Sequence, residues 1–211
     1  MAQASVIALR LYGVAAVESG QATSLVDGTS LVHYRALAAI VEPASYSAPA
    51  PTEEDTERYM YILEQAFTSA TVLPAPPGTV FQSQNTLMRW LELHYFTLTE
   101  ALAVVEGHSA ARVSITARPG QDGDTGRSFA ALAAESLRML RSQAAATVTL
   151  PKVDEDDEDG VVARASFLVD SQRWQTFNET VKKEAQRQPA LAFNVTGPWP
   201  PYDFVRMQFG G

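Results

Sequence analysis

The side chains best suited to acid–base or metal chemistry near neutral pH are the three histidines, His33, His94 and His108. None lies three or four residues from another, so the helical spacing by which two imidazoles share a metal ion is missing. The chain has no cysteine, which excludes disulfides, thiolate catalysis and Cys-ligated zinc. We therefore expect no metal site, no cofactor and no enzymatic activity. A catalytic site built from residues distant in sequence is the alternative that spacing does not test.

Two acidic stretches could bind cations. Residues 119–126 resemble a calcium loop, but an EF-hand starting at Asp122 needs Glu at its twelfth position, and Ala133 stands there. We expect a plain turn at residues 119–126. The run Asp154–Asp159 supplies six of the eight excess negative charges, which leaves −2 for the rest of the chain. Since six like charges repel and stay solvated, we expect a flexible connection between strands, with an ion or partner contact as the alternative.

Charge and hydropathy exclude two other classes of partner. The net charge of −8 lacks the basic excess of a nucleic-acid binder, and the only aromatic residue on the predicted central strands of the second half is Phe167. We therefore expect no nucleic-acid partner. The arginines of this half are expected to be solubilising: Arg112, Arg118, Arg127, Arg138 and Arg141. No window reaches about 18 uncharged apolar residues, so we expect no membrane span.

The most unusual segment lies near the C-terminus. Residues 196–204 contain three prolines and the three aromatic residues Trp199, Tyr202 and Phe204. Prolines fix φ and remove N–H donors, so the segment cannot be a central strand. We expect an extended ribbon whose aromatic side chains either pack on the core or form a rigid surface for a partner. Trp199 is the expected anchor, and Tyr202 and Phe204 are the expected recognition residues.

The elements of the first half follow from apolar patterning and turn signals. We predict a strand over 6–14, a hairpin at Asp27-Gly28 and a strand over 36–41. Thr52 followed by three acids predicts the start of a helix over about 53–70. Apolar residues at three- and four-residue spacing predict one long helix over about 84–105, which Gly107 would cap.

The second half predicts the element order β-α-β-β-α-β. Strands are expected over 110–117, 147–150, 161–169 and 191–195, with helices ending near Ala146 and Arg187. This order is that of a ferredoxin-like sandwich, with two helices on one face of a four-stranded antiparallel sheet. The predicted fold class is therefore α+β, with two small α/β-sandwich domains. Their predicted bounds are 1–107 and 108–211, the second domain being ferredoxin-like and carrying the C-terminal ribbon.

Several short blocks of the sequence match a known pattern. The block T-G-P-W-P-P-Y-D-F-V at 196–205 resembles the C-terminal signature of the gas vesicle protein family GvpF/GvpL. Similar blocks are V-V-A-R-A-S-F-L-V-D at 161–170, V-L-P at 72–74 with G-T-V-F at 78–81, L-Y-G-V at 11–14 and L-A-A-I-V at 37–41. The chain departs from the family pattern in having Pro76-Pro77 before Gly78 and in lacking an acidic–aromatic pair around 107–111.

The resemblance implies a non-enzymatic accessory or minor structural protein of gas vesicles, located in the cytoplasm and associated with the vesicle. Its expected partners are the small hydrophobic shell protein, during nucleation and assembly, and other gas vesicle accessory proteins. Such a subunit exposes a large apolar face that must be protected before it is placed. Because ferredoxin-like folds host many functions, a regulatory or small-molecule-binding module without catalytic activity is the alternative.

Overall fold

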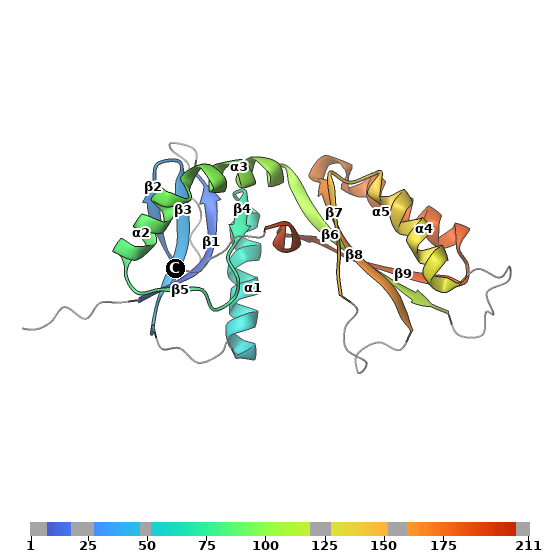
Figure 1. The fold of residues 1–211 in the computed structure, drawn as a ribbon, viewed down its shortest axis with the longest axis horizontal. Coiled ribbons are helices and arrows are strands. Elements are labelled where there is room, and N and C mark those ends of the chain that lie inside the picture. The colour runs from blue at the N-terminus through green and yellow to red at the C-terminus, as the bar shows by residue number, and fades with distance from the viewer. Residues whose placement is uncertain (1–7, 18–27, 47–51, 119–127, 152–159, 206–211) are drawn as a thin grey trace, which may run out of the picture. The chain divides into compact units, whose positions relative to one another are not determined.

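A computed structural model describes residues 8–17, 28–46, 52–118, 128–151 and 160–205 (Figure 1). The chain divides into two compact units between Glu106 and Gly107, and the second unit ends at Phe204. Three predictions fall on residues outside these ranges: Asp27 of the predicted hairpin turn, the loop at 119–126 and the acidic run Asp154–Asp159.

The first unit is built on an antiparallel sheet. In the described ranges its strands are β1 (Ala8–Ala16), β2 (Ser30–Tyr34), β3 (Leu37–Ala44), β4 (Val72–Pro74) and β5 (Val80–Phe81). Their order is β2-β3-β1-β4, and β5 pairs with β1. The apolar run predicted as a strand over 6–14 is β1, shifted by two residues. The hairpin that joins β2 and β3 turns at Arg35, which has a φ of +53°, and the sequence did not predict this turn.

Helix α1 (Glu53–Phe67) begins where the sequence predicted and ends three residues earlier. The Thr52 hydroxyl accepts a hydrogen bond from the Asp55 N–H at 3.2 Å, and the Asp55 carboxylate accepts one from the Thr52 N–H at 3.0 Å. This reciprocal capping satisfies two N–H donors that lack partners within the helix.

The predicted helix over 84–105 is wrong in one respect, because two helices replace it. They are α2 (Gln84–Leu93) and α3 (Tyr95–Val105), and His94 between them leaves helical geometry with φ −100° and ψ 10°. Helix α2 packs against β2 and β5, whereas α3 packs against β1 and β4. The break therefore lets each helix follow its own part of the sheet. Gly107, with a φ of +69°, ends α3 as predicted.

Helices cover both faces of the first sheet. Glu42 of β3 accepts a hydrogen bond from Arg58 of α1 at 2.9 Å. Leu37 lies five residues earlier on β3 and pairs with Tyr34 of β2, so the two side chains share one face of the sheet. The Tyr34 ring lies edge-on to the Tyr95 ring of α3, with 5.8 Å between centroids. Side chains an odd number of residues apart on a strand point to opposite faces. Helix α1 thus covers one face and α3 the other.

The second unit has the predicted order β-α-β-β-α-β. Its elements are β6 (His108–Ala117), α4 (Phe129–Arg141), β7 (Ala146–Thr149), β8 (Val161–Asp170), α5 (Trp174–Arg187) and β9 (Leu191–Trp199), with short 3₁₀ turns η1 (Ser171–Arg173) and η2 (Tyr202–Phe204). The antiparallel strand order β7-β8-β6-β9, drawn from the described residues, is that of a ferredoxin-like sheet. The predicted α+β fold class, with a ferredoxin-like second half, is confirmed.

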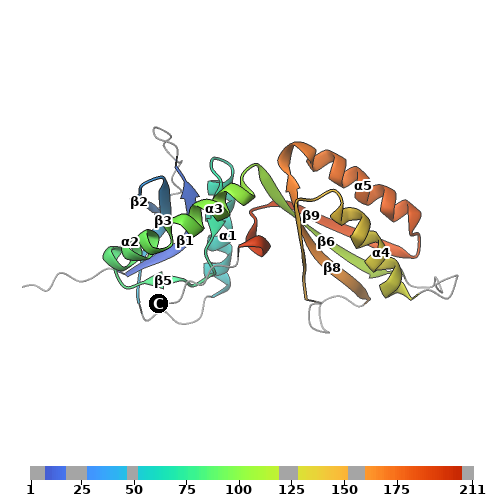
Figure 2. The same ribbon diagram turned by 45° about the horizontal axis from the view of Figure 1, so that its top comes forward.

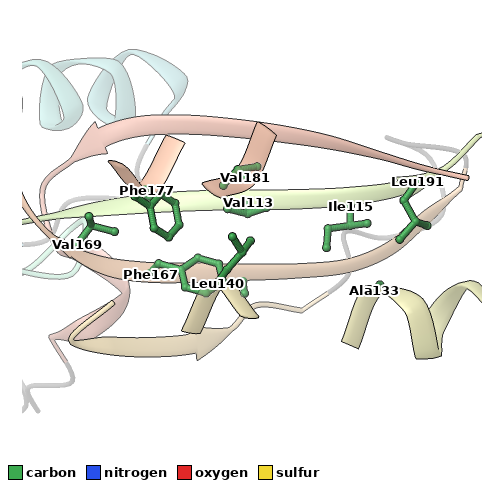
Figure 3. Close-up of a cluster of buried hydrophobic side chains, with 11 residues drawn as sticks. Val113, Ile115, Ala133, Leu140, Phe167, Val169, Phe177, Val181 and Leu191 are labelled. Atoms are coloured by element: carbon green, nitrogen blue, oxygen red, sulfur yellow. The ribbon is translucent and has the colours of Figure 1, made fainter. Parts of the chain in front are cut away.

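Both helices of the second unit lie on one side of its sheet (Figure 2). Figure 3 shows side chains of β6 and β8 meeting those of α4 and α5 in one apolar cluster. The rings of Phe167 and Phe177, both almost fully buried, pack with 5.4 Å between centroids. Val113 and Ile115 belong to the same cluster, so the odd-numbered residues in the middle of β6 face the helices.

Candidate partner-binding segment

The three aromatic residues singled out in the sequence occupy two successive elements. Trp199 is the last residue of β9, and Tyr202 and Phe204 lie in η2. Strand β9 lies at the edge of the sheet, beside β6. The prediction that this proline-containing segment is not a central strand is therefore confirmed. All three aromatic side chains are partly buried, whereas Pro200 and Pro201 between them are buried.

Gly197 lets the segment approach the sheet closely. Its φ of +126° is a conformation that L side chains rarely adopt, and a Cβ atom there would lie 2.6 Å from the Ala110 carbonyl oxygen and 2.9 Å from the Trp174 ring. Two residues later, Trp199 pairs with Ala110, and its indole N–H donates a hydrogen bond to the Thr196 hydroxyl at 3.1 Å. The Trp199 side chain is thereby tied to Thr196 of the same strand and is partly buried.

An ion pair fastens η2 to the sheet. The Arg112 guanidinium donates two hydrogen bonds of 2.9 Å each to the two carboxylate oxygens of Asp203. This two-pronged geometry is the strongest that a guanidinium and a carboxylate can form. The Asp203 side chain is only 13% exposed and that of Arg112 is 39% exposed. The expectation that Arg112 is merely a solubilising charge is thus wrong.

The ion pair lies on the face of the sheet opposite the helices. Arg112 alternates with Ala111 and Val113, which belong to the helix-covered core, so its side chain points the other way. The turn η2 also contacts β7, at the other edge of the sheet. The chain therefore leaves β9 and crosses the helix-free face. There it holds Tyr202 and Phe204 on either side of the anchored Asp203.

Sequence reasoning missed this contact because 91 residues separate its partners. One signal was present, namely a single acid between two aromatic residues in a proline-restricted segment. When the two aromatic residues pack against the sheet, the acid between them becomes partly buried. A partly buried carboxylate needs a cationic or hydrogen-bonding partner. The alternation of β6 placed Arg112 on the correct face, but nothing in the sequence identified it as that partner.

A second group of charged side chains anchors α1 to the first sheet. Arg10 pairs with Asp55, and the buried Tyr12 donates a 2.8 Å hydrogen bond to Glu42, which also pairs with Arg58. Hydrogen bonds from the Thr52 backbone and from Arg10 lower the pKa of Asp55 to about 2. Burial, followed by the contact with Glu42, raises the pKa of Tyr12. These contacts explain how the helix is held to the sheet.

The three histidines belong to three different segments of the fold. His33 is exposed on β2, His94 packs its ring against Trp90 with 5.1 Å between centroids, and His108 begins β6. In the described part of the chain, His, Asp and Glu side chains do not gather in a group of three that could hold a metal ion. The helices within the same ranges are too short or too polar to span a bilayer.

Comparisons with known proteins agree over nearly the full length. Gas vesicle protein F1 of Halobacterium salinarum is 27% identical over 183 residues, which are 85% of this chain and 82% of that protein. Gas vesicle protein F of Haloferax mediterranei is 25% identical over 211 residues, 95% of each chain. The crystal structure of GvpF from Anabaena sp. PCC7120 superposes with a TM-score of 0.76 over 96% of this chain and 97% of its own, at 16% identity. GvpF from Microcystis aeruginosa gives a TM-score of 0.71 at 13% identity, covering 96% and 100%.

The structural likeness establishes the fold, and the sequence likeness establishes the family. Residues 8–126 and 122–206 match the profile of the family described as gas vesicle synthesis protein GvpL/GvpF. The blocks quoted from the sequence, the ferredoxin-like second unit and the C-terminal segment all lie within these matches. The chain therefore belongs to the GvpL/GvpF family of gas vesicle proteins.

Proposed function

We propose that this protein binds the small hydrophobic shell protein of gas vesicles during nucleation and assembly. It acts as a non-enzymatic accessory or minor structural component, in the cytoplasm and at the growing vesicle, with other accessory proteins as further partners. Membership of a family of gas vesicle proteins supports the process. A shell subunit with a large apolar face aggregates unless another surface covers that face, which is the step this protein would serve.

The observation that carries this proposal is the geometry of the C-terminal segment. Tyr202 and Phe204 are partly exposed, the Tyr202 hydroxyl itself being buried, and they flank an acid held by two hydrogen bonds. The preceding prolines restrict the backbone, and the ion pair restricts η2. Aromatic groups that are rigid before binding lose little conformational entropy on binding, so more of their apolar contact appears as affinity. Trp199, hydrogen-bonded to Thr196 within β9, contributes more to holding the segment than to recognition.

Co-expression with the shell protein tests the proposal. The tagged full chain and its Tyr202→Ala and Phe204→Ala variants would be purified, and the captured shell protein measured per folded molecule. We expect capture to fall about fivefold in each variant, equivalent to about 1 kcal/mol. Tyr46→Ala is the matched control, because Tyr46 is a 61% exposed aromatic residue of the first unit. If both variants melt early and capture falls only with the folded fraction, the segment is structural and the proposal fails.

We also infer that the two compact units are separate domains with bounds near 1–107 and 108–211. Each has its own sheet and buried apolar residues, which is what independent folding requires. Expressing the two fragments separately and recording thermal melts tests this. Each fragment should unfold cooperatively, and a fragment that stays unfolded alone would contradict the inference.

A further inference from the structure

The second sheet has an open edge at β9. Within the described ranges, β9 pairs with β6 on one side and with no strand on the other. Such an edge presents main-chain N–H and C=O groups to other strands, and proteins usually protect it by short length, charged side chains or proline. The opposite edge strand, β7, is four residues long and ends two residues before Pro151. Strand β9 is nine residues long and carries no charged side chain.

The hydrogen-bond pattern shows which groups of β9 point outward. The Arg118 N–H donates to the Ala190 C=O at 3.0 Å, in the register in which β6 pairs with β9. Hydrogen-bonded pairs alternate with non-hydrogen-bonded pairs along an antiparallel ladder, so residues 192, 194 and 196 direct their main chain toward β6. Phe193 and Val195 therefore direct theirs outward. Among the described residues, no strand or turn supplies hydrogen-bond partners for these outward groups.

The side chains of the same two residues are also incompletely covered. Phe193 and Val195 pack against the apolar cluster beneath the helices, yet both remain only partly buried. Asn194 between them is exposed on the other face of the sheet. A further strand beside β9 would satisfy the outward main-chain groups and cover these two apolar side chains in one contact.

We propose that β9 pairs in antiparallel orientation with β9 of a second copy of this chain, around a two-fold axis at Asn194. Phe193 of each copy then lies opposite Val195 of the other, and their main chains exchange hydrogen bonds. An aromatic residue opposite a β-branched one is a stabilising cross-strand pair. The edge is thus complementary to itself, as a two-fold contact requires, and no like charges on β9 oppose the pairing. The proposal does not rest on the shell-binding function.

Helix α5 leaves room for this pairing. Arg187 contacts Glu135 of α4, so it marks the side of α5 that faces the other helix. At 3.6 residues per turn, the opposite side carries three uncharged, partly buried residues: Trp174, Asn178 and Ala185. The Trp174 ring lies beside Gly197 of β9, which places this side of the helix over the open edge. The nearest charged residue is the exposed Lys182, whose two copies would repel weakly, so added salt should leave the dimer equally stable or strengthen it.

Sedimentation of the full chain over a concentration series tests the pairing. The contact is short, so we expect a dimer with a dissociation constant in the micromolar range. Val195→Pro removes an outward N–H and spares the bonds to β6, and it should raise the dissociation constant about tenfold or more. Val195→Lys, which keeps the main chain and places a charge beside Phe193 of the second copy, should do the same. Circular dichroism melts would establish that each variant is folded.

A matched proline on the other edge strand is the control. The Leu150 N–H donates to the Arg164 C=O at 3.0 Å, so the preceding residue, Thr149 of β7, directs its own N–H outward. Thr149→Pro should leave the dissociation constant unchanged.

A single cysteine locates the two-fold axis. The chain contains no cysteine, so Asn194→Cys introduces its only thiol. In the proposed dimer the two copies of residue 194 lie directly opposite, with Cβ atoms about 4.5–5.5 Å apart, and mild oxidation should link them. Thr149→Cys, exposed on β7, should not link. The proposal is overturned by a chain that stays monomeric at about 100 μM. It is also overturned by a dimer that both Val195 variants leave intact, that Thr149→Pro weakens equally, that salt dissociates or that Asn194→Cys does not link.

Discussion

The ion pair between Arg112 and Asp203 allows a quantitative test of how the C-terminal segment is held. Exposed pairs contribute about 0.2–1 kcal/mol, and breaking a fully buried pair costs about 3–5 kcal/mol. With side chains 39% and 13% exposed and two hydrogen bonds of 2.9 Å, this pair lies between those limits. We expect Asp203→Ala to lower the free energy of unfolding of the second unit by about 2 kcal/mol. We expect a coupling energy between the two residues of about 1–1.5 kcal/mol.

A double-mutant cycle measures the coupling energy. Arg112→Ala, Asp203→Ala and the double variant would be unfolded in urea, with tryptophan fluorescence as the signal. Two of the three tryptophans, Trp174 and Trp199, lie in the second unit and report its unfolding. In 1 M salt the coupling should decrease by less than half, because a partly buried pair is screened less than an exposed one.

The contact between Arg187 and Glu135 is the matched control. It joins α5 to α4 at 2.8 Å with side chains 40% and 29% exposed, so its coupling should stay below about 1 kcal/mol. A coupling between Arg112 and Asp203 no larger than that of the control would refute the reasoning. The segment would then be held by its prolines and aromatic side chains, with Asp203 incidental.

Three further predictions concern single features. Gly197→Ala should destabilise the second unit by about 2–3 kcal/mol, because its Cβ would clash with the Ala110 carbonyl at a φ of +126°. Gly107→Ala, at a φ of +69° with open space around it, should cost only about 1 kcal/mol; equal costs in urea unfolding would contradict this account. The pKa of Asp55 is lowered to about 2, so its contribution to stability is complete above its unfolded pKa near 4 and is lost as pH falls toward 2. In acid unfolding curves, the difference in the free energy of unfolding between the wild type and Asp55→Asn should therefore shrink between pH 4 and pH 2. A difference that stays constant over that range would show that the ionised Asp55 carboxylate does not stabilise the fold. Replacing Asp154–Asp159 with a Gly/Ser linker should leave the melting temperature equal or slightly higher, since like charges repel, and a fall of more than a few degrees would indicate an ion or partner contact.

Local patterns in the sequence were enough to predict most of the elements and most of their buried faces, although the break at His94 and the turn at Arg35 were not among them. The order β-α-β-β-α-β from β6 to β9 restricts a small domain to few arrangements, and the ferredoxin-like sheet is one of them. The spacing of Leu87, Leu91, Leu98 and Leu102 identified the side of α2 and α3 that is buried. Thr52 followed by acids identified the start of α1. These features depend on residues within a few turns of one another, so a single sequence displays them.

The tertiary structure alone decided which distant residues meet and which faces stay open. Arg112 and Asp203 are brought together only when β9 pairs with β6 and the chain crosses the helix-free face. The break at His94 reflects the strands that α2 and α3 cover, which helical periodicity does not contain. Phe96 and Val104 would count as core residues on composition alone, and they lie in solvent because the opposite side of α3 already fills the sheet. Local propensity acts over a few residues, whereas burial and ion pairing depend on the complete packing.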